Sequence, residues 1–492
     1  MERSTYRNLL KTVLFTLLVI IMLLGILHVV NYKSTGGGGG FQRFYQKKSN
    51  SIDVMFFGSS HAHCTIDHGY LWDEYGMAGY TLSAGGQRLD STYYFIKEAL
   101  RTQTPRVIVV EMLGATGNEI QNTDTDVYRN ALSMRWSDNS VEYMNYLADS
   151  MQMDKTGREE LFTKIPIVHS RYRELEQSDF VDRIPFMVGY RGSYERAPIE
   201  RPDVAGDKEI LSLTEEKIPI LQNIIDEAKA KGVEVVFFAS PFRLSQEQQE
   251  QFNAVEEFAA AQNIPFINYN KLYDEIDLDF ERDFRDSEHV NNYGAVKVTR
   301  HLAEFLKENY EIPDRRGEAD YQLWEDNALY LSNKVLRHEL EETTDVNTYL
   351  EYLAGNGKEK TILVALTGNY NALGEVYLEK LLQLGVTAEE YAAGGVFLFR
   401  GGEREAFLPG KEYNRCFTTP GGEIHVESSV TTTEDGEETQ KLKLLINGQD
   451  YVMVENGVNI IVYEESIDQV IDAAGDDVYL GLELAHKEII ED

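Results

Sequence analysis

The chain has 492 residues, of which 42% are hydrophobic and 26% charged, so it is long enough for two or three domains with a core each. Its 82 acidic and 47 basic residues give a net charge of −35, which repels the phosphates of nucleic acids. A nucleic-acid partner is therefore not expected. The acidity is strongest in residues 311 to 492.

The first apolar segment predicts a membrane anchor. Thr12 to Val30 is an uncharged run of 19 residues, which as a helix roughly matches a 30 Å hydrocarbon layer. We expect a cytoplasmic tail at 1–11, a transmembrane anchor at 12–32 and a glycine-rich tether at 33–42. A cleaved signal peptide is the alternative, but the run is long for one and no small-x-small cleavage site follows.

Strand and helix patterns alternate in the next part of the chain, for which we expect one domain at 43–312. Apolar runs predict strands at 52–57, 80–84, 106–112, 233–239 and 265–268, and helical patterns lie at 61–75, 90–102, 211–231, 246–262 and 295–309. This alternation predicts an α/β fold with a mostly parallel sheet and helices on both faces.

Two polar blocks mark the ends of this domain. Ser60 follows the first predicted strand at a tight turn into a helix, where a serine is either a nucleophile or a plain helix cap. Asp286 precedes His289 by three residues, just before the last helix, so that one turn of chain can hold the carboxylate against the imidazole. Together they favour a serine nucleophile with a histidine base.

These blocks carry a family resemblance. Gly58-Ser59-Ser60 after a first strand, with Asp286-x-x-His289 before the last helix, resembles the SGNH (GDSL-type) hydrolase superfamily. Within it, the segments FFGSSHAHCTIDHGYLWDEYG, VIVVEMLG and DxxHVNNYGA are similar to DltD-like proteins and alginate-type O-acetyltransferases. The resemblance covers roughly residues 50 to 310 and implies a flavodoxin-type sheet.

The resemblance also implies roles for residues. Ser60 would be the nucleophile, His289 the general base and Asp286 its orienting partner. The Ser60 and Gly86 backbone N–H groups would stabilise an oxyanion. The family's Gly-x-Asn-Asp block is missing here, and Asn118 is only a candidate for the role of its Asn, in a register that does not match.

Other polar residues have open interpretations. Glu111 either faces a substrate cleft or caps a strand in solvent, and Arg285 either neutralises a substrate anion or pairs with Asp283. His61 and His63 are spaced by two residues, which does not bring helical side chains together, so metal binding is not expected. No metal or organic cofactor is expected for the enzyme, and Cys64 and Cys416 are either two free thiols or one interdomain disulfide.

A long insertion at about 114–207 is expected to cover the site as a lid. Its aromatic and basic residues either bind glycan or pack on the sheet. They are Tyr128, Arg129, Trp136, Arg171, Tyr172, Arg173, Tyr190, Arg191 and Tyr194.

Residues 313–492 predict a separate small, acidic α/β domain. Helical patterns lie at 327–342, 347–354 and 372–384, and strand patterns at 361–366, 395–399, 423–430, 441–446, 451–455 and 458–463. The segments ENGVNIIVYEESIDQVID, KTILVALTGN and GGVFLFRGG weakly resemble the interleukin-like EMT inducer (PANDER-like) domain, which implies carbohydrate or protein binding.

The sequence as a whole predicts a single-pass protein of the cell membrane with an extracytoplasmic serine acyltransferase or esterase domain. By resemblance its substrates are acyl esters of a cell-envelope glycopolymer, either teichoic acid or exopolysaccharide, and a polytopic membrane O-acyltransferase is a partner. The alternative is a non-catalytic assembly protein that binds glycan or a partner on an SGNH scaffold.

Overall fold

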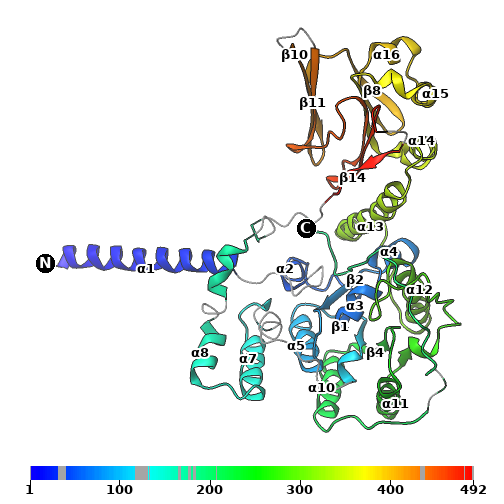
Figure 1. Ribbon diagram of the computed structural model, residues 1–492. Coiled ribbons are helices and arrows are strands. Elements are labelled where there is room, and N and C mark those ends of the chain that lie inside the picture. Colours follow the sequence, from blue (N-terminus) through cyan, green and yellow to red (C-terminus); the bar gives the residue numbers. More distant parts are fainter. Residues whose placement is uncertain are drawn as a thin grey trace. The chain divides into compact units, whose positions relative to one another are not determined.

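The computed structural model describes residues 2–30, 40–116, 131, 133–163, 168–175, 179–180, 184–204, 206, 208–432, 438–480 and 483–489. It contains two compact units, Met1–Ala328 and Leu329–Asp492, and each is described by itself (Figure 1).

The first unit begins with a long apolar helix. Helix α1 (Glu2–Val30) contains a 25-residue stretch, Tyr6–Val30, with a mean hydropathy of 3.0 and few buried residues. This confirms an N-terminal helix that is long and apolar enough to cross a membrane.

A five-stranded sheet forms the centre of the first unit, with strand order β2-β1-β3-β4-β5 and every pair parallel. The strands are β1 (Val54–Gly58), β2 (Gly79–Ser83), β3 (Val107–Glu111), β4 (Glu234–Ala239) and β5 (Phe266–Asn268). All five expected strands are confirmed. The order is that of flavodoxin-like sheets, in which ligands bind at the carboxyl ends of the strands.

Helices cover both faces of this sheet (Figure 1). They are α3 (Ser60–Thr65), α4 (His68–Tyr75), α5 (Leu89–Ala99), α10 (Lys217–Ala230), α11 (Gln246–Ala261) and α12 (Asn292–Asn309), with short 3-10 turns η1 (Leu113–Ala115), η4 (Tyr269–Lys271) and η5 (Ala319–Tyr321). Met55 and Phe57 of β1 pack in one core with Phe95 of α5 and Ile224 of α10. Helix α12 packs against α3 and α4 on the other face.

The helix expected at 61–75 is two helices. The first ends at Thr65, and Asp67 begins the second, because its carboxylate accepts hydrogen bonds from the N–H groups of Gly69 (2.9 Å) and Tyr70 (3.1 Å). Such an N-cap is typical of a new helix start. The break confines Ser60 to a helix of only six residues.

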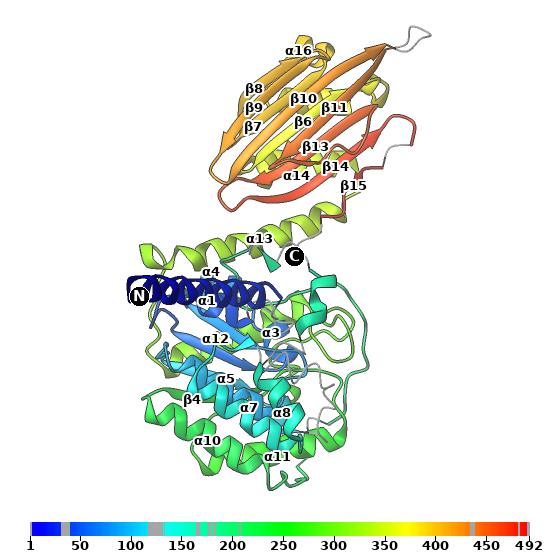
Figure 2. The ribbon, with the colours of Figure 1, turned by 90° about the vertical axis from the view of Figure 1, so that its left-hand side faces the viewer.

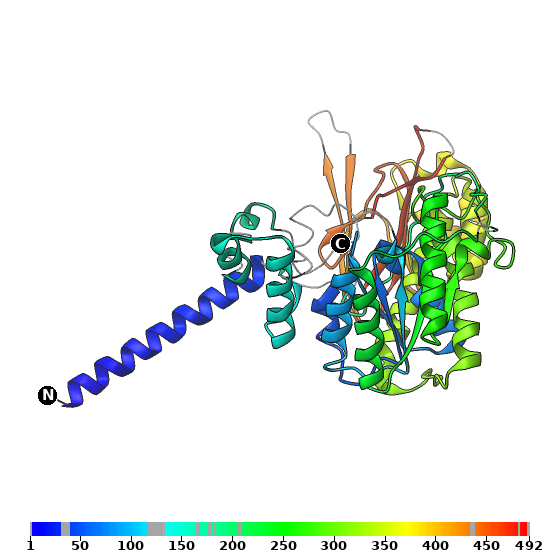
Figure 3. The same ribbon diagram turned by 90° about the horizontal axis from the view of Figure 1, so that it is seen from below.

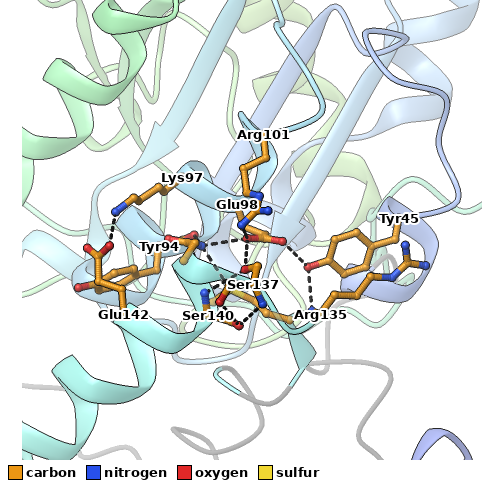
Figure 4. Close-up of polar contacts among 11 residues, drawn as sticks. Tyr45, Tyr94, Lys97, Glu98, Arg101, Arg135, Ser137, Ser140 and Glu142 are labelled. Carbon is orange, nitrogen blue, oxygen red and sulfur yellow. Dashed lines mark hydrogen bonds and ion pairs between the residues drawn. The ribbon is translucent and has the colours of Figure 1, made fainter. Parts of the chain in front are cut away.

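The segment after the anchor is attached to the first unit. Helix α2 (Gly40–Phe44) buries Phe41, whose ring centroid lies 4.6 Å from that of Phe95. Next to it, the Tyr45 hydroxyl donates to the buried carboxylate of Glu98 (2.9 Å), as Figure 4 shows. The expected tether of 33–42 therefore ends before Gly40, since an aromatic residue at 41 is part of the core.

The insertion contains further helices. They are α7 (Asp138–Ser150), α8 (Lys155–Thr163) and the 3-10 helix η2 (His169–Arg173). Glu98 also accepts hydrogen bonds from Ser137 (3.1 Å) and Asn139 (3.1 Å), so the same buried carboxylate holds the start of α7 and the segment after α2 (Figure 4).

Residues 313 to 328 belong to the first unit, later in the chain than the expected boundary. Arg315 forms a two-point ion pair with Asp53 (both 2.9 Å), and the Trp324 indole donates to the carbonyl of Gly79 (2.8 Å). These contacts bind the segment to the sheet edge, and the division falls within α13 (Gln322–Glu341).

The second unit has two antiparallel sheets, seen in Figure 2. Their orders are β15-β14-β13-β6-β7-β8 and β12-β11-β10-β9. The strands are β6 (Thr361–Thr367), β7 (Gly395–Arg400), β8 (Glu403–Pro409), β9 (Tyr413–Thr419), β10 (Gly422–Thr432), β11 (Glu438–Ile446), β12 (Gln449–Asp450), β13 (Gly457–Glu464), β14 (Gln469–Asp477) and β15 (Ala485–His486). The helices are α14 (Val346–Gly355), α15 (Val376–Gln383), α16 (Ala388–Ala393), η6 (Asn356–Glu359) and η7 (Tyr370–Leu373).

One strand expected in this unit is absent. Residues 451–455 are irregular, because the N–H groups of Met453 (2.7 Å) and Val454 (2.9 Å) donate to the Asn459 side chain in place of a neighbouring strand. Strands β8, β9, β12, β14 and β15 have no counterpart among the expected elements. Of these, β8 and β9 are largely exposed and lack an apolar run, whereas β14 is buried.

Candidate active site

The candidate site lies where the parallel strands end. Ser60 follows β1 as the first residue of α3, and Asp286 and His289 come from the loop before α12. That loop is closed by an antiparallel bridge between Phe284 and Val290 and by the hydrogen bond from Arg285 N–H to the His289 carbonyl (3.1 Å).

The three side chains are in hydrogen-bond contact. The Ser60 Oγ lies 2.8 Å from Nε2 of His289, and Nδ1 of the same ring lies 2.9 and 3.1 Å from the two Asp286 oxygens. Because a carboxylate only accepts hydrogen bonds, Nδ1 carries the proton and Nε2 accepts the serine hydroxyl. This arrangement can remove a proton from Ser60 as it attacks a carbonyl carbon.

Asp286 is held as an anion. Burial raises the pKa of Asp286, but the Glu288 N–H and the nearby His289 and Arg285 outweigh it, so that the pKa lies below its ordinary value. The N–H of His289 also donates to Asp286 (2.8 Å). The carboxylate is therefore both charged and fixed in direction.

Glu111 supports the turn Gly58-Ser59-Ser60, which presents the candidate nucleophile Ser60. Its carboxylate accepts the Ser59 hydroxyl (2.8 Å), the Ser59 N–H (3.3 Å) and the Leu113 N–H (2.5 Å), and the residue is 2% exposed. The solvated cap offered for Glu111 is wrong, since the side chain is buried at the end of β3, and its role in a substrate cleft stays a prediction. Burial raises its pKa to about 7, although these hydrogen bonds oppose the shift.

Because Gly58 has no side chain, Glu111 can approach the turn closely enough to bind Ser59. Its φ is +146°, and a Cβ there would lie 2.5 Å from Cβ of Glu111. A side chain at this position would separate Glu111 from the turn.

Gly86 lies in the loop after β2, at the carboxyl ends of the strands, where Ser60 also lies. β2 pairs in register with β1 up to Gly58 and Ser83, so the loop containing Gly86 (φ +59°) leaves the sheet beside the Ser60 turn. Asn118, the other residue expected near an oxyanion, lies outside the described residues.

His61 and His63 are neutral and buried. Burial lowers the pKa of each to about 3, His61 with a further contribution from His289 and His63 from Arg191. His63 Nδ1 lies 2.9 Å from the Ser83 hydroxyl, and the His61 ring is edge-on to the His289 ring at 5.3 Å. They therefore pack around the site. Within the described residues, no His, Cys, Asp and Glu side chains form a group that could hold a metal ion.

Arg285 pairs with Asp286, at 3.2 Å, and not with Asp283. Asp283 is buried and is neutralised by Lys297 (2.7 Å), which corrects the expected Arg285–Asp283 pair. The guanidinium of Arg285 thus stabilises the charged form of Asp286.

The end of the insertion, residues 186–199, forms a strap beside the site, within the segment that was expected to cover the site as a lid. The Arg191 N–H donates to the His63 carbonyl (2.7 Å), and the Ser193 carbonyl accepts from the Asn292 N–H (2.9 Å). The strap therefore ties the helix of Ser60 to the start of α12, directly after the loop of His289. Its pattern Gly189-x-x-Gly192 was the available signal, since a Cβ at Gly189 would lie 2.1 Å from the Thr81 carbonyl oxygen.

The residues proposed as a glycan-binding lid are dispersed. Tyr190 is buried and its hydroxyl donates to the Asn292 side chain (2.8 Å), whereas Arg171 contacts the end of α1. Tyr128 and Arg129 lie outside the described residues. Cys64 is buried beside the site and Cys416 is exposed, and both are free thiols.

Comparisons with known proteins add little. No family profile and no curated protein matches the chain. One solved structure that matches is a "putative acylhydrolase" from Bacteroides fragilis NCTC 9343, at 12% identity and a TM-score of 0.27, over 55% of this chain and 95% of that chain. Values this low establish neither a shared fold nor a shared activity.

Proposed function

We propose that this protein is a membrane-anchored serine acyltransferase or esterase of the SGNH type, with its catalytic domain outside the cytoplasm. Its substrates would be acyl esters, acetyl or D-alanyl, of a cell-envelope glycopolymer such as teichoic acid or exopolysaccharide. The observation that carries the proposal is the contact chain from Ser60 through His289 to Asp286, with spacings of 2.8 and 2.9 Å.

The reaction has two halves. Ser60 Oγ attacks the acyl carbonyl carbon while His289 Nε2 takes the hydroxyl proton, and the proton then passes to the departing alkoxide as the original ester bond breaks. In the second half, the hydroxyl of an acceptor sugar or a water loses its proton to His289 and attacks the carbonyl carbon of the Ser60 ester. His289 then gives that proton to Ser60 Oγ as the ester bond to the serine breaks, which restores the free hydroxyl. Asp286 stabilises the imidazolium formed in each half.

Two backbone groups are proposed to stabilise the oxyanion. They are the N–H groups of Ser60 and Gly86, by resemblance to the SGNH superfamily. Support for Ser60 comes from its place as the first residue of α3, where helical N–H groups have no partner within the helix. Gly86 has support from its loop, which emerges beside the nucleophile turn.

The proposed location and partners of the protein rest on the apolar helix α1 and on the family resemblance. The apolar span of α1 supports a single-pass anchor in the cell membrane. A polytopic membrane O-acyltransferase is proposed as the acyl donor, and the second unit is proposed to bind glycan or a partner protein.

The test is labelling of the full chain in detergent with a fluorophosphonate, followed by intact-mass and peptide mass spectrometry. We expect one adduct, on Ser60, and none in His289→Ala. A fragment starting at residue 43 is unsuitable because it lacks Phe41, which is completely buried. A folded chain without an adduct would refute the catalytic proposal and favour the non-catalytic binding protein.

A further inference from the structure

The end of α1 is fixed to the insertion. Arg171 of η2 donates from Nη1 to the carbonyl oxygen of Val30 (3.2 Å), the last residue of α1. Val30 is only 8% exposed, and Leu27 packs against the same core. Carbonyls at a helix C-terminus have no partner within the helix and attract cationic side chains, so this contact stabilises the junction. Figure 3 shows α1 ending at the insertion.

A second segment of the insertion is held at the same place. Nη2 of Arg171 lies 3.0 Å from both carboxylate oxygens of Asp179, and both side chains are largely buried. Arg171 therefore joins three pieces of chain: the end of α1, η2 and the segment of Asp179.

Each of these two insertion segments presents an exposed aromatic ring. Tyr172, next to Arg171, is 59% exposed, and Phe180, next to Asp179, is 63% exposed. Arg173 lies over the Tyr172 ring (5.4 Å) and donates to its hydroxyl (3.0 Å). Aromatic residues and arginine are enriched at the boundary between lipid and water.

We propose that Tyr172 and Phe180 form a membrane-docking surface that inserts into the headgroup region of the bilayer at the point where α1 leaves it. The inference rests on the proposed anchor, because the occupant is identified by continuity with α1. If α1 spans the bilayer, the lipid–water boundary passes near Val30, and both rings adjoin the Arg171–Asp179 ion pair, whose arginine contacts Val30. The insertion then acts as a second attachment that limits rotation of the catalytic domain about α1.

The experiment places a tryptophan at each position. Of the three native tryptophans, Trp72 and Trp324 are buried and Trp136 is exposed. Trp136→Phe therefore gives a background chain in which no native tryptophan is exposed to brominated lipid. In it, Tyr172→Trp and Phe180→Trp are compared with Leu24→Trp within α1 and with Ile218→Trp in α10, an exposed control that lies away from α1 in Figures 1 and 2. The full chain is reconstituted in phosphatidylcholine vesicles with or without bromine near the headgroup end of the acyl chains. Circular dichroism checks that each variant is folded.

We expect brominated lipid to reduce the emission of the reporters at 172, 180 and 24, with no change at 218. Quenching at 24 without quenching at 172 and 180 would refute the docking surface while the anchor stands, and would point to a protein partner for the two rings. No quenching at any position would refute the anchor and the docking surface together.

Discussion

The carboxylate of Glu111 accepts both the N–H and the hydroxyl of Ser59, the residue directly before Ser60. A buried group at the end of β3 therefore fixes the backbone that presents the nucleophile. Glu111 touches neither Ser60 nor His289 in the described contacts, so it is a positioning residue.

Replacing Glu111 tests this role. Glu111→Gln keeps the shape of the side chain but places an amide N–H₂ group, a donor, against N–H and hydroxyl donors. The loss of these hydrogen bonds destabilises the turn by about 1 to 2 kcal/mol. We expect fluorophosphonate labelling of Ser60 to slow about tenfold. Glu288→Gln, an exposed carboxylate in the histidine loop, is the matched control and should label normally. Equal rates for all three proteins would contradict the positioning role.

The same residue predicts a pH dependence of stability. Burial raises the pKa of Glu111 to about 7 from an ordinary 4.5, so protonation favours the folded state. This contribution is complete below about pH 4.5 and is lost as the pH rises through 7. In urea titrations at pH 5 and pH 8, the free energy of unfolding of the wild type should fall more than that of Glu111→Gln. Parallel losses would show that another group is responsible.

Asp286→Asn separates orientation from proton transfer. The asparagine can donate to Nδ1 of His289, which favours the tautomer with a proton on Nε2 and removes the acceptor for the Ser60 hydroxyl. We expect labelling of Ser60 to slow by at least about 100-fold with a normal thermal unfolding midpoint. Asp274→Asn, an exposed partner of Arg201, serves as control. Rapid labelling of Asp286→Asn would mean that His289 needs no orienting carboxylate.

The strap depends on Gly189. Its φ is +103° and an added Cβ would lie 2.1 Å from a backbone oxygen of Thr81, so Gly189→Ala should reduce the free energy of unfolding by about 2 kcal/mol or more. Gly206→Ala, where a Cβ meets no described residue within 4 Å, should change it by less than about 0.5 kcal/mol. Chemical denaturation of both variants measures the difference. If Gly189→Ala lowers the free energy of unfolding no more than Gly206→Ala does, the backbone of the strap can shift to accept a side chain at 189.

The second unit has a histidine whose two ring nitrogens both face acceptors. His486 Nδ1 lies 3.1 Å from the buried Asp472 carboxylate, and Nε2 lies 3.2 Å from the Thr343 carbonyl. Burial lowers the pKa of His486, but the Asp472 bond and charge, the Thr343 carbonyl and Glu341 outweigh it, so the pKa is raised.

Because the pKa of His486 is raised in the folded state, the second unit should lose stability as the pH rises. A raised histidine pKa gives stability that is complete below the ordinary value of 6.5 and is lost as the pH rises through the folded value. Hydrogen exchange of β15 should therefore become faster, relative to β13, between pH 6 and pH 9 after correction for intrinsic rates. In His486→Gln this extra pH dependence should disappear. If it persists, His486 is not its source.

The sequence by itself determined what local pattern encodes. The apolar run of α1, the positions of the five strands, and the spacing of Asp286 and His289 each depend on neighbouring residues, because helix and strand periods and one turn of chain act over a few positions. The order of the strands is set by contacts between distant residues. Ser60 could be identified by its place after the first strand.

The tertiary structure alone decided how distant residues meet. Glu111, Gly189 and Arg171 act through contacts with Ser59, Thr81 and Val30, and no local pattern specifies those partners. The helix α2 was missed for the same reason, since Phe41 is fixed by burial against Phe95 and not by the glycines before it. Burial also shifts the pKa values of Glu111, His61 and His63, which their residue types leave open because desolvation depends on the fold.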